Sequence, residues 1–280
     1  MTSWGSPIPS ACPREAIDAR QVTKDTCCFQ AKRRQAIYIS VDHICDLEIV
    51  AMMRHLQRAL RGFGIEVRRP RPDLFDFIRD RRIELIYDVG ANAGQFGAWT
   101  RERGYHGKLI SFEPIRLVFQ ELEQKTRRDG KWKAFNFGLG DTAGQLDIHV
   151  SKDSRFSSFL DLDDAAVQFD QNSTAVSQER VEVKKLDDVA DDGEPNYLIK
   201  IDTQGFEKAV LEGGRRTLSR SKGVLLELPV VQFYRGNWTL PEALTYMASL
   251  GFIPAQIAPV NFDHEDGMSM VEVDCLFRPV

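Results

Sequence analysis

The segment DVGANAG, Asp88 to Gly94, reads as a glycine-containing turn that begins with an acidic residue. It follows the apolar run Ile83–Tyr87 and precedes a helix-like segment. Glycines at such a turn allow positive φ angles, and the new helix offers free N–H groups to a ligand. The dinucleotide pattern Gly-x-Gly-x-x-Gly is matched imperfectly, because Asn92 stands where a glycine is expected. A carboxylate at Asp88 suits a ligand with an amino group and a sulfonium cation, such as S-adenosylmethionine. A simple packing turn is the alternative.

A second predicted strand, Lys108–Glu113, ends in an acid where a ribose-binding carboxylate is expected. A carboxylate accepts hydrogen bonds from both ribose hydroxyls, so Glu113 is the candidate. A solvated turn residue beside Pro114 is the alternative. The two features together, at this spacing, favour a nucleoside site over two unrelated turns.

A third acid, Asp202, stands at the tip of another predicted strand, before the glycine turn of Lys200–Glu207. It should point into the same crevice as Asp88. There it can orient an acceptor hydroxyl or take its proton, provided that it reaches the hydroxyl. The alternative role is a helix N-cap for the segment that starts at Phe206.

Short strands alternate with helices from Ile83 onward, which predicts a doubly wound, mostly parallel α/β sheet with ligands at the carboxyl ends of its strands. A long excursion, residues 146–185, contains an alternating pair that reads as an antiparallel hairpin and a substrate lid. The expected strands are 83–89, 108–113, 133–138, 197–202, 224–228, 252–258 and 271–277, and the expected helices are 95–103, 115–127, 206–218 and 241–250.

The N-terminal part divides into two predicted segments, ahead of a main domain at 83–280 with its insertion at 146–185. Residues 1–36 are rich in Ser, Pro and charge, which predicts a disordered extension. Residues 37–82 predict a helical segment, in which Ile44–Leu60 has helical spacing and can pack on the main domain or form a homo-oligomer contact. Asp73 is expected to cap a short helix that runs through Ile78.

The composition is that of a soluble enzyme: 280 residues, 42% hydrophobic and 28% charged. A formal net charge of −4 argues against general nucleic-acid binding. The five cysteines lack paired metal spacing and fit a reducing compartment better than a disulfide framework. No apolar stretch approaches the roughly 18 residues of a membrane span, so we expect a cytoplasmic protein without a transmembrane segment.

Several sequence blocks, taken in order, resemble the FkbM-type S-adenosylmethionine-dependent methyltransferases. They are IYDVGANAGQF, ISFEP, FNFGLGDTAG, the triplet Ser157-Ser158-Phe159, VKKLDDV, IKIDTQGFEKAVLEGG and LLELP, and they run from about Ile83 to Leu228. The resemblance implies a Rossmann-like class I methyltransferase fold with an antiparallel C-terminal strand. It also implies transfer of a methyl group from S-adenosyl-L-methionine to a hydroxyl of a sugar, glycolipid, polyketide or other natural product.

The resemblance assigns roles to individual residues. Asp202 would stand beside the transferred methyl, as the catalytic group. The family usually has Glu where this chain has Gln204, so no carboxylate is available at that position. The expected cofactor-binding residues are Asp88, Gly90, Asn92, Gly94, Glu113, Gly138, Leu139 and Asp141, and the expected substrate residues are Ser157, Ser158, Gln204, Glu227 and His264.

The acceptor is expected to be a glycan or glycolipid hydroxyl first and another small metabolite second. Aromatic residues on predicted loops, Phe156, Phe233, Tyr234 and Trp238, can stack on a sugar ring or pack in the core. No metal site is expected, because the consecutive residues 263–266 rarely converge on one ion. Two other readings remain open: a non-catalytic binder of S-adenosylmethionine that serves another enzyme, and a nicotinamide dehydrogenase.

Overall fold

The computed structural model describes Leu60 and residues 71–280, apart from 164, 165, 167, 168, 191, 192, 194, 264 and 265. The chain divides into two compact units, residues 1–71 and 72–280, and everything below concerns the second. The expected extension 1–36 and the expected helix at 44–60, except Leu60, lie outside the described residues. Among the described residues, no helix has both the length and the apolar character needed to cross a bilayer.

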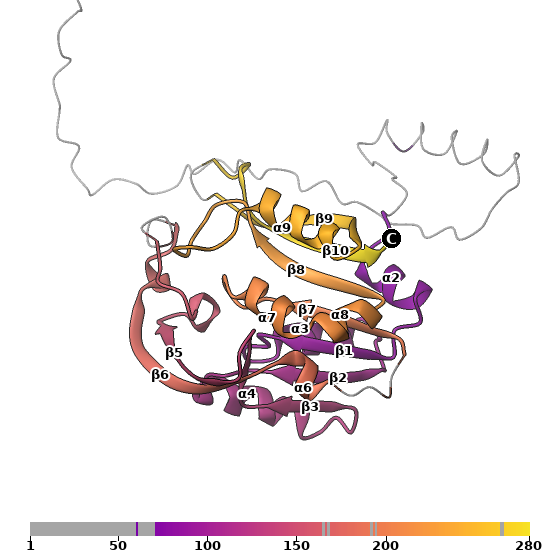
Figure 1. Ribbon diagram of the computed structural model, residues 1–280, viewed down its shortest axis with the longest axis horizontal. Helices are drawn as coiled ribbons and strands as arrows, with labels where there is room; N and C mark the ends of the chain where they lie inside the picture. The colour runs from indigo at the N-terminus through magenta and orange to yellow at the C-terminus, as the bar shows by residue number, and fades with distance from the viewer. Residues whose placement is uncertain are drawn as a thin grey trace, which may run out of the picture. The chain divides into compact units, whose positions relative to one another are not determined.

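The main domain is built on a seven-stranded sheet with the order β3-β2-β1-β7-β8-β10-β9 (Figure 1). All pairs among the first five strands are parallel, whereas β10 runs antiparallel to both β8 and β9. This is the mostly parallel, doubly wound α/β sheet with an antiparallel C-terminal strand that was predicted. Its strands are β1 (Leu85–Val89), β2 (Lys108–Phe112), β3 (Trp132–Phe135), β7 (Tyr197–Ile201), β8 (Gly223–Pro229), β9 (Phe252–Phe262) and β10 (Met270–Pro279).

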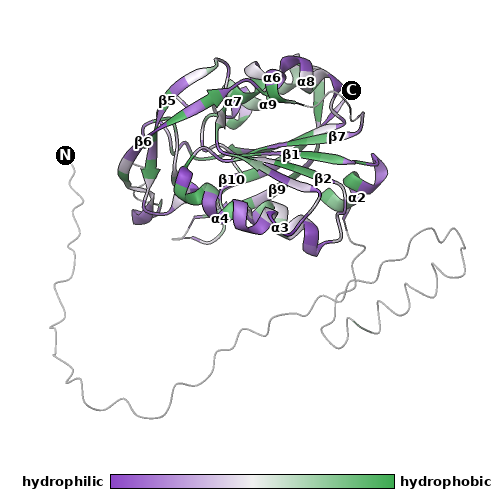
Figure 2. Ribbon diagram, turned by 90° about the horizontal axis from the view of Figure 1, so that it is seen from below, coloured by the Kyte–Doolittle hydropathy of each residue, from purple (hydrophilic) through white to green (hydrophobic). Residues whose placement is uncertain are grey.

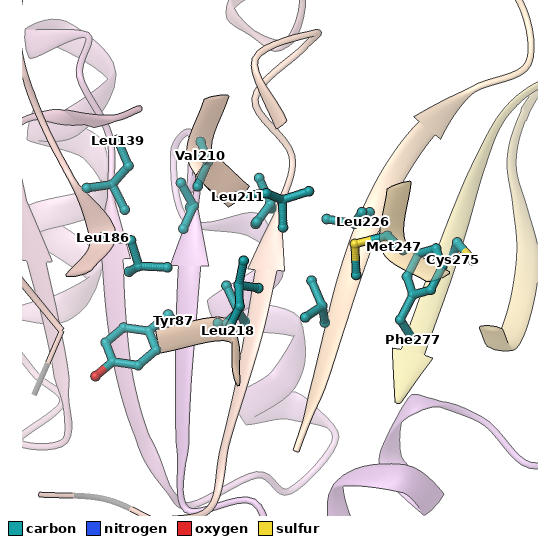
Figure 3. Close-up of a cluster of buried hydrophobic side chains, with 14 of the residues drawn as sticks. Tyr87, Leu139, Leu186, Val210, Leu211, Leu218, Leu226, Met247, Cys275 and Phe277 are labelled. Atoms are coloured by element: carbon teal, nitrogen blue, oxygen red, sulfur yellow. The ribbon is translucent and has the colours of Figure 1, made fainter. Parts of the chain in front are cut away.

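Alternate residues of a strand point to opposite faces of the sheet. Because both faces carry buried apolar side chains, helices cover both of them. Tyr87 belongs to a core with Leu186, Val210 and Leu218 on the face of α6 to α9 (Figure 3). Leu85 belongs to the same core. The opposite core lies on the face of α2, α3 and α4. In Figure 2 the central strands are hydrophobic along most of their length. The helices are α2 (Leu74–Asp80), α3 (Gln95–Glu102), α4 (Arg116–Thr126), α6 (Leu186–Val189), α7 (Glu207–Gly213), α8 (Arg215–Arg220) and α9 (Leu240–Ser249).

Helix α2 begins as predicted, with Asp73 as its N-cap. The Asp73 side chain accepts hydrogen bonds from the backbone N–H groups of Phe75 and Asp76, at 2.9 and 3.1 Å. Phe77 and Ile78 of this helix pack in the same core as the strands. The compact unit therefore begins at Pro72, ahead of the boundary at residue 83 expected from the sequence.

A smaller sheet with the order β4-β6-β5 contains the predicted antiparallel pair. Its strands are β4 (Gly138–Leu139), β5 (Gly144–Ser151) and β6 (Ala175–Lys184), and Leu146 lies opposite Val181 in the register. Between β5 and β6 the chain forms two short 3₁₀ turns, η1 (Ser154–Phe156) and η2 (Gln171–Ser173). We refer to residues 152–174 as the lid segment, of which 164, 165, 167 and 168 are outside the described residues.

Three predicted elements differ from the structure by more than two residues. The strand expected at 252–258 continues to Phe262 in β9. The strand expected at 133–138 ends at Phe135, and the chain enters the second sheet at Gly138, because the Asn136 amide donates to the carbonyl oxygens of Glu113 and Pro114. The helix expected at 206–218 is broken into α7 and α8 at Gly214.

Close packing explains the break between α7 and α8. A Cβ on Gly214 would lie 2.8 Å from Leu186 Cδ2, and a Cβ on the preceding Gly213 would lie 1.9 Å from the carbonyl oxygen of Gly140. Only glycines allow this approach, and two adjacent glycines are poor helix formers.

Candidate active site

A cavity of about 580 Å³ lies at the carboxyl ends of β1, β2, β7 and β8. Small-molecule sites in proteins are commonly of this size, and in α/β sheets they lie at this edge. The structure brings nine of the residues predicted from the sequence to its wall. They are Gly90, Asn92, Glu113, Gly138, Leu139, Ser157, Asp202, Gln204 and Glu227.

The turn after β1 adopts left-handed backbone conformations at Gly90, Asn92 and Gly94, with φ of 72°, 48° and 81°. Asn is among the few residues other than glycine that tolerate this region, which explains why it can replace the expected glycine. A Cβ on Gly90 would lie 1.8 Å from the carbonyl oxygen of Asp202, so the turn and the tip of β7 are in contact. Gly94 does not line the cavity, and a Cβ there would meet Leu122.

Glu113 is fixed by the backbone on both sides. Its Oε2 accepts from the N–H of Asn92 at 2.9 Å and its Oε1 from the N–H of Ile115 at 2.8 Å. Burial raises the pKa of Glu113 to about 7, although these two hydrogen bonds act in the opposite direction. Each carboxylate oxygen has a second lone pair, so Glu113 can still accept hydrogen bonds from a ligand.

Asp88 lies beneath the cavity and does not line it. Its side chain is fully buried, accepts a hydrogen bond from Ser111 Oγ at 3.0 Å, and forms an ion pair with Lys200 at 3.3 Å. Trp132 Nε1 donates in turn to Ser111 Oγ at 3.0 Å. Asp88 therefore supports the turn from below through its partners, whereas the sequence placed it on the methionine part of the cofactor.

Lys200 joins the two acids at the tips of β1 and β7. Its Nζ lies 3.3 Å from Asp88 Oδ1 and 3.2 Å from Asp202 Oδ2, and it donates to the carbonyl oxygen of Gly90 at 3.3 Å. Burial acts to lower the pKa of Lys200, but the carboxylates of Asp202 and Asp88 outweigh it and raise that pKa above its usual value. The sequence reasoning missed Lys200. A lysine in the otherwise apolar, buried strand YLIKI was the available signal, because such a charge requires an acidic partner.

Asp202 does not cap α7, whose N-cap residue is Phe206. One of its carboxylate oxygens accepts from Gln204 Nε2 at 2.9 Å, and the other forms the ion pair with Lys200. The turn that follows is held by Glu207, whose Oε1 accepts from the backbone N–H groups of Thr203 and Gly205, both at 3.0 Å. Burial raises the pKa of Glu207 to about 7.

Gln204 has a left-handed backbone conformation with φ of 54°. Its side chain hydrogen-bonds to three residues near the end of β7. Its Nε2 donates to Glu227 Oε1 at 3.2 Å as well as to Asp202, and its Oε1 accepts from the Tyr234 hydroxyl at 2.9 Å. Its backbone carbonyl accepts from Ser158 Oγ at 2.6 Å. Ser158 thus ties the lid segment to this turn and does not itself line the cavity.

One part of the cavity wall is acidic. Glu227 comes from β8, and Glu272 and Asp274 from β10. Burial raises the pKa of Glu227 well above its usual range, and the charges of Asp202 and Glu272 add to the shift. Burial likewise raises the pKa of Asp274 to about 6. Sequence reasoning missed Glu272 and Asp274, although their alternation with buried Val271, Val273 and Cys275 in β10 was a signal for a common face.

The part of the cavity beside Glu113 is apolar. Ile115, Leu139, Ile148 and Phe159 line it, and a Cβ on Gly138 would lie 3.1 Å from Phe159 Cζ. This surface suits a flat, weakly polar ring next to a pair of ribose hydroxyls.

Other predicted residues lie elsewhere. Asp141 is exposed and outside the cavity wall, and His264 is outside the described residues. Of the aromatic candidates, Phe156 lines the cavity, whereas Phe233, Tyr234 and Trp238 are buried.

Comparison with known proteins agrees with this geometry. Residues 88–254, more than half of the chain, match the family model described as methyltransferase FkbM domain. A curated relative, "2-O-methyltransferase NoeI" of Sinorhizobium fredii (strain NBRC 101917 / NGR234), is 24% identical over 211 residues, which cover 71% of this chain and 87% of the relative.

Solved structures with a similar arrangement include two methyltransferases. Magnesium protoporphyrin IX methyltransferase of Synechocystis PCC 6803, solved with bound SAM, is 8% identical, with 86% of this chain and 87% of that chain covered and a TM-score of 0.43. An rRNA methylase of Streptococcus thermophilus is 10% identical, with 73% and 93% covered and a TM-score of 0.40. With a family match across most of the sheet and a cavity at the strand tips that it spans, this chain belongs to the FkbM family of methyltransferases.

Proposed function

We propose that this protein transfers a methyl group from S-adenosylmethionine to a hydroxyl of a sugar, a glycolipid or another natural product. The observation that carries the proposal is a single cavity with Glu113 beside an apolar surface at one end and Asp202 beside an acidic wall at the other. A nucleoside fits the first end, and an acceptor hydroxyl fits the second.

The residues present fit S-adenosylmethionine. Glu113 would hold the ribose hydroxyls, because its oxygens keep free lone pairs. Gly138 and Leu139 would lie against adenine, and the turn at Gly90 and Asn92 would lie along the methionine part. When bound, S-adenosylmethionine supplies an electrophilic methyl group on a positively charged sulfur.

The chain's own residues must orient the acceptor and exclude water. Asp202 is held in one orientation by Lys200 and Gln204, so it can accept a hydrogen bond from an acceptor hydroxyl without further rearrangement. The lid segment contacts the cofactor turn through Ser154 Oγ, which lies 3.1 Å from Asn92 Nδ2. Its Phe156 carbonyl accepts from the Tyr234 hydroxyl at 3.1 Å. Through these contacts the lid segment would help to keep water from the reacting groups.

The cavity wall also supports an acceptor without negative charge. Two cationic residues line it within the described part of the chain, and both are paired with acids. Lys200 pairs with Asp202, and Arg155 with Asp153 at 2.6 Å. Carboxylates accept hydrogen bonds from sugar hydroxyls, so a glycan or glycolipid is our first choice and another small metabolite the second. The name of the curated relative, a 2-O-methyltransferase, supports a hydroxyl as the methylated group.

The first experiment is calorimetric titration of the purified protein with S-adenosylmethionine, with NAD as the comparison ligand. We expect binding of S-adenosylmethionine alone, whereas binding of NAD alone would favour a dehydrogenase. Glu113→Gln should weaken cofactor binding about 10- to 100-fold, the effect of losing hydrogen bonds to a charged group. Because the pKa of Glu113 is about 7, cofactor affinity in the wild type should fall as the pH drops below 7.

The second experiment incubates the protein with methyl-labelled S-adenosylmethionine and extracts of its source organism, followed by identification of the labelled product. We expect label on an oxygen of a glycan or small metabolite. Asp202→Ala should lose turnover and keep its affinity for the cofactor. Binding without any label transfer would favour the non-catalytic alternative.

A further inference from the structure

We infer that Glu227, and not Asp202, takes the proton of the acceptor hydroxyl, while Asp202 orients that hydroxyl. The inference rests on the proposed function and adds a catalytic residue to it. It starts from the two carboxyl groups that share the amide of Gln204 at the acceptor end of the cavity.

Asp202 is suited to orient a hydroxyl, because both of its carboxylate oxygens have a protein partner and each keeps a second lone pair. Lys200 Nζ lies 3.2 Å from Oδ2, and Gln204 Nε2 donates to Oδ1 at 2.9 Å. Uptake of a proton by Asp202 would break its ion pair with the buried Lys200. The same two contacts fix its orientation, which a positioning group needs.

Glu227 is placed differently. It lies near the end of β8 and lines the cavity together with Asp202. Among the described residues, its side chain has one hydrogen bond, from Gln204 Nε2 to Oε1 at 3.2 Å. Both carboxyl groups are therefore within hydrogen-bond reach of one amide nitrogen, and both line the cavity in which the acceptor hydroxyl is proposed to bind.

The surroundings of Glu227 favour proton uptake. Asp202 faces it from β7, Glu272 and Asp274 face it from β10, and Lys200 is the opposing positive charge. Burial, followed by the repulsion from these three acids, raises the pKa of Glu227 well above its ordinary value, and Lys200 acts in the opposite direction. A general base works best when its pKa is near the working pH, and two neighbouring carboxyl groups in unlike environments commonly divide their roles in this way.

The acidic wall is not arranged as a metal site: within the described ranges, no group of three or more acids, histidines or cysteines is placed to hold a metal ion.

The proposed step balances without any further reactant. A bond forms between the acceptor oxygen and the methyl carbon while the methyl–sulfur bond breaks, and the electron pair of that bond stays on sulfur. The hydroxyl proton passes to the Glu227 carboxylate, which becomes a neutral carboxylic acid and later releases the proton to water.

Kinetics on the labelled acceptor test the assignment. Glu227→Gln should lower kcat about 100- to 10,000-fold, the usual contribution of a general base, while cofactor affinity stays within about threefold. The wild-type rate should rise with pH until Glu227 is ionised, and this dependence should vanish in Glu227→Gln. Glu227→Asp, which keeps a carboxylate with shorter reach, should recover part of the loss.

Glu272→Gln is the matched control, because it removes another carboxylate from the same wall. Glu272 accepts from Asn261 Nδ2 at 2.6 Å, and its charge helps to raise the pKa of Glu227. Its loss should therefore act mainly on KM and should shift the pH dependence of kcat to lower pH without abolishing it. An equal loss of kcat in both variants, with both pH profiles flattened, would overturn the assignment to Glu227 and point to the charge of the whole wall.

A readout without turnover is the titration of the protein with ¹³C-labelled Glu carboxyl groups, followed by NMR. The resonance that disappears in Glu227→Gln should titrate well above pH 4.5, and titration at or below 4.5 would overturn the inference. The two levels of failure are distinct. A wild-type protein that labels no acceptor contradicts the proposed function, whereas an active wild type matched by Glu227→Gln contradicts only the role of Glu227.

Discussion

The side-chain nitrogen of Gln204 lies 2.9 Å from Oδ1 of Asp202, and the same nitrogen donates to Glu227. The uncharged amide group of Gln204 therefore lies between the two acids and donates one N–H to each of them. A glutamate at this position would place a third carboxyl group between them. With Gln204, this end of the cavity is a hydrogen-bonded network in which there is less repulsion between carboxylates.

We therefore expect Gln204→Glu to destabilise the protein by about 1–3 kcal/mol at pH 8, because it loses two donors and adds a negative charge. The loss should shrink toward pH 5, since protonation of the introduced carboxyl restores a donor and removes the charge. Urea unfolding at several pH values measures this. Gln204→Met is the control, and its loss should not depend on pH. Identical pH profiles for the two variants would contradict the electrostatic explanation.

Lys200→Met tests the buried ion pair under the turn. Asp88 has no exposed surface, so removal of the ammonium leaves a buried charge without its partner, which typically costs about 3–5 kcal/mol. We expect a drop of this size in the free energy of unfolding. The double variant Lys200→Met with Asp88→Asn should recover a large part of the loss, because it leaves no unpaired charge at Asp88. A single variant as stable as the wild type would show that the pair does not support the turn.

Glu207 gives a pH dependence of stability with a defined sign. Its pKa is raised by burial from 4.5 to about 7, so its contribution is fully present below pH 4.5 and is lost as the pH rises through 7. Glu207→Gln keeps an acceptor for Thr203 and Gly205 and cannot ionise. Relative to the wild type, we expect this variant to gain up to about 3 kcal/mol between pH 4.5 and 8. Chemical denaturation of both proteins at pH 4.5 and at pH 8 measures this gain. A difference in stability that is the same at both pH values would contradict the raised pKa of Glu207.

Gly90 and Gly104 form a matched pair for the contact between the cofactor turn and β7. Both have positive φ, 72° and 87°, so Ala brings similar backbone strain of about 1–2 kcal/mol at each site. A Cβ on Gly90 would meet the Asp202 carbonyl oxygen at 1.8 Å, whereas none is within 4 Å at Gly104. Gly90→Ala should therefore lose at least about 1–3 kcal/mol more in thermal or urea unfolding. Equal losses would mean that the two segments separate easily.

Local patterns in the sequence predicted most of the fold. The apolar run and glycines of Ile83–Gly94 predicted β1, the turn and α3, and Asp73 predicted the start of α2. These features depend on neighbours within a few residues, where backbone preference and capping act. The break at Gly214 was not predicted, because its cause is the approach of Leu186, far away in the chain.

The residues of the site can also be divided into those that local sequence patterns placed and those that only the tertiary structure placed. By itself, the sequence placed Glu113 and Asp202 at strand ends, because strand length and alternation are local properties. Glu227 was expected at the site only from the family resemblance. Only the tertiary structure decided that Lys200 pairs with Asp88 beneath the cavity and that Glu272 joins Glu227 across β8 and β10. Ion pairs and pKa shifts depend on burial and on distances between separate strands, and strand order and packing set both quantities.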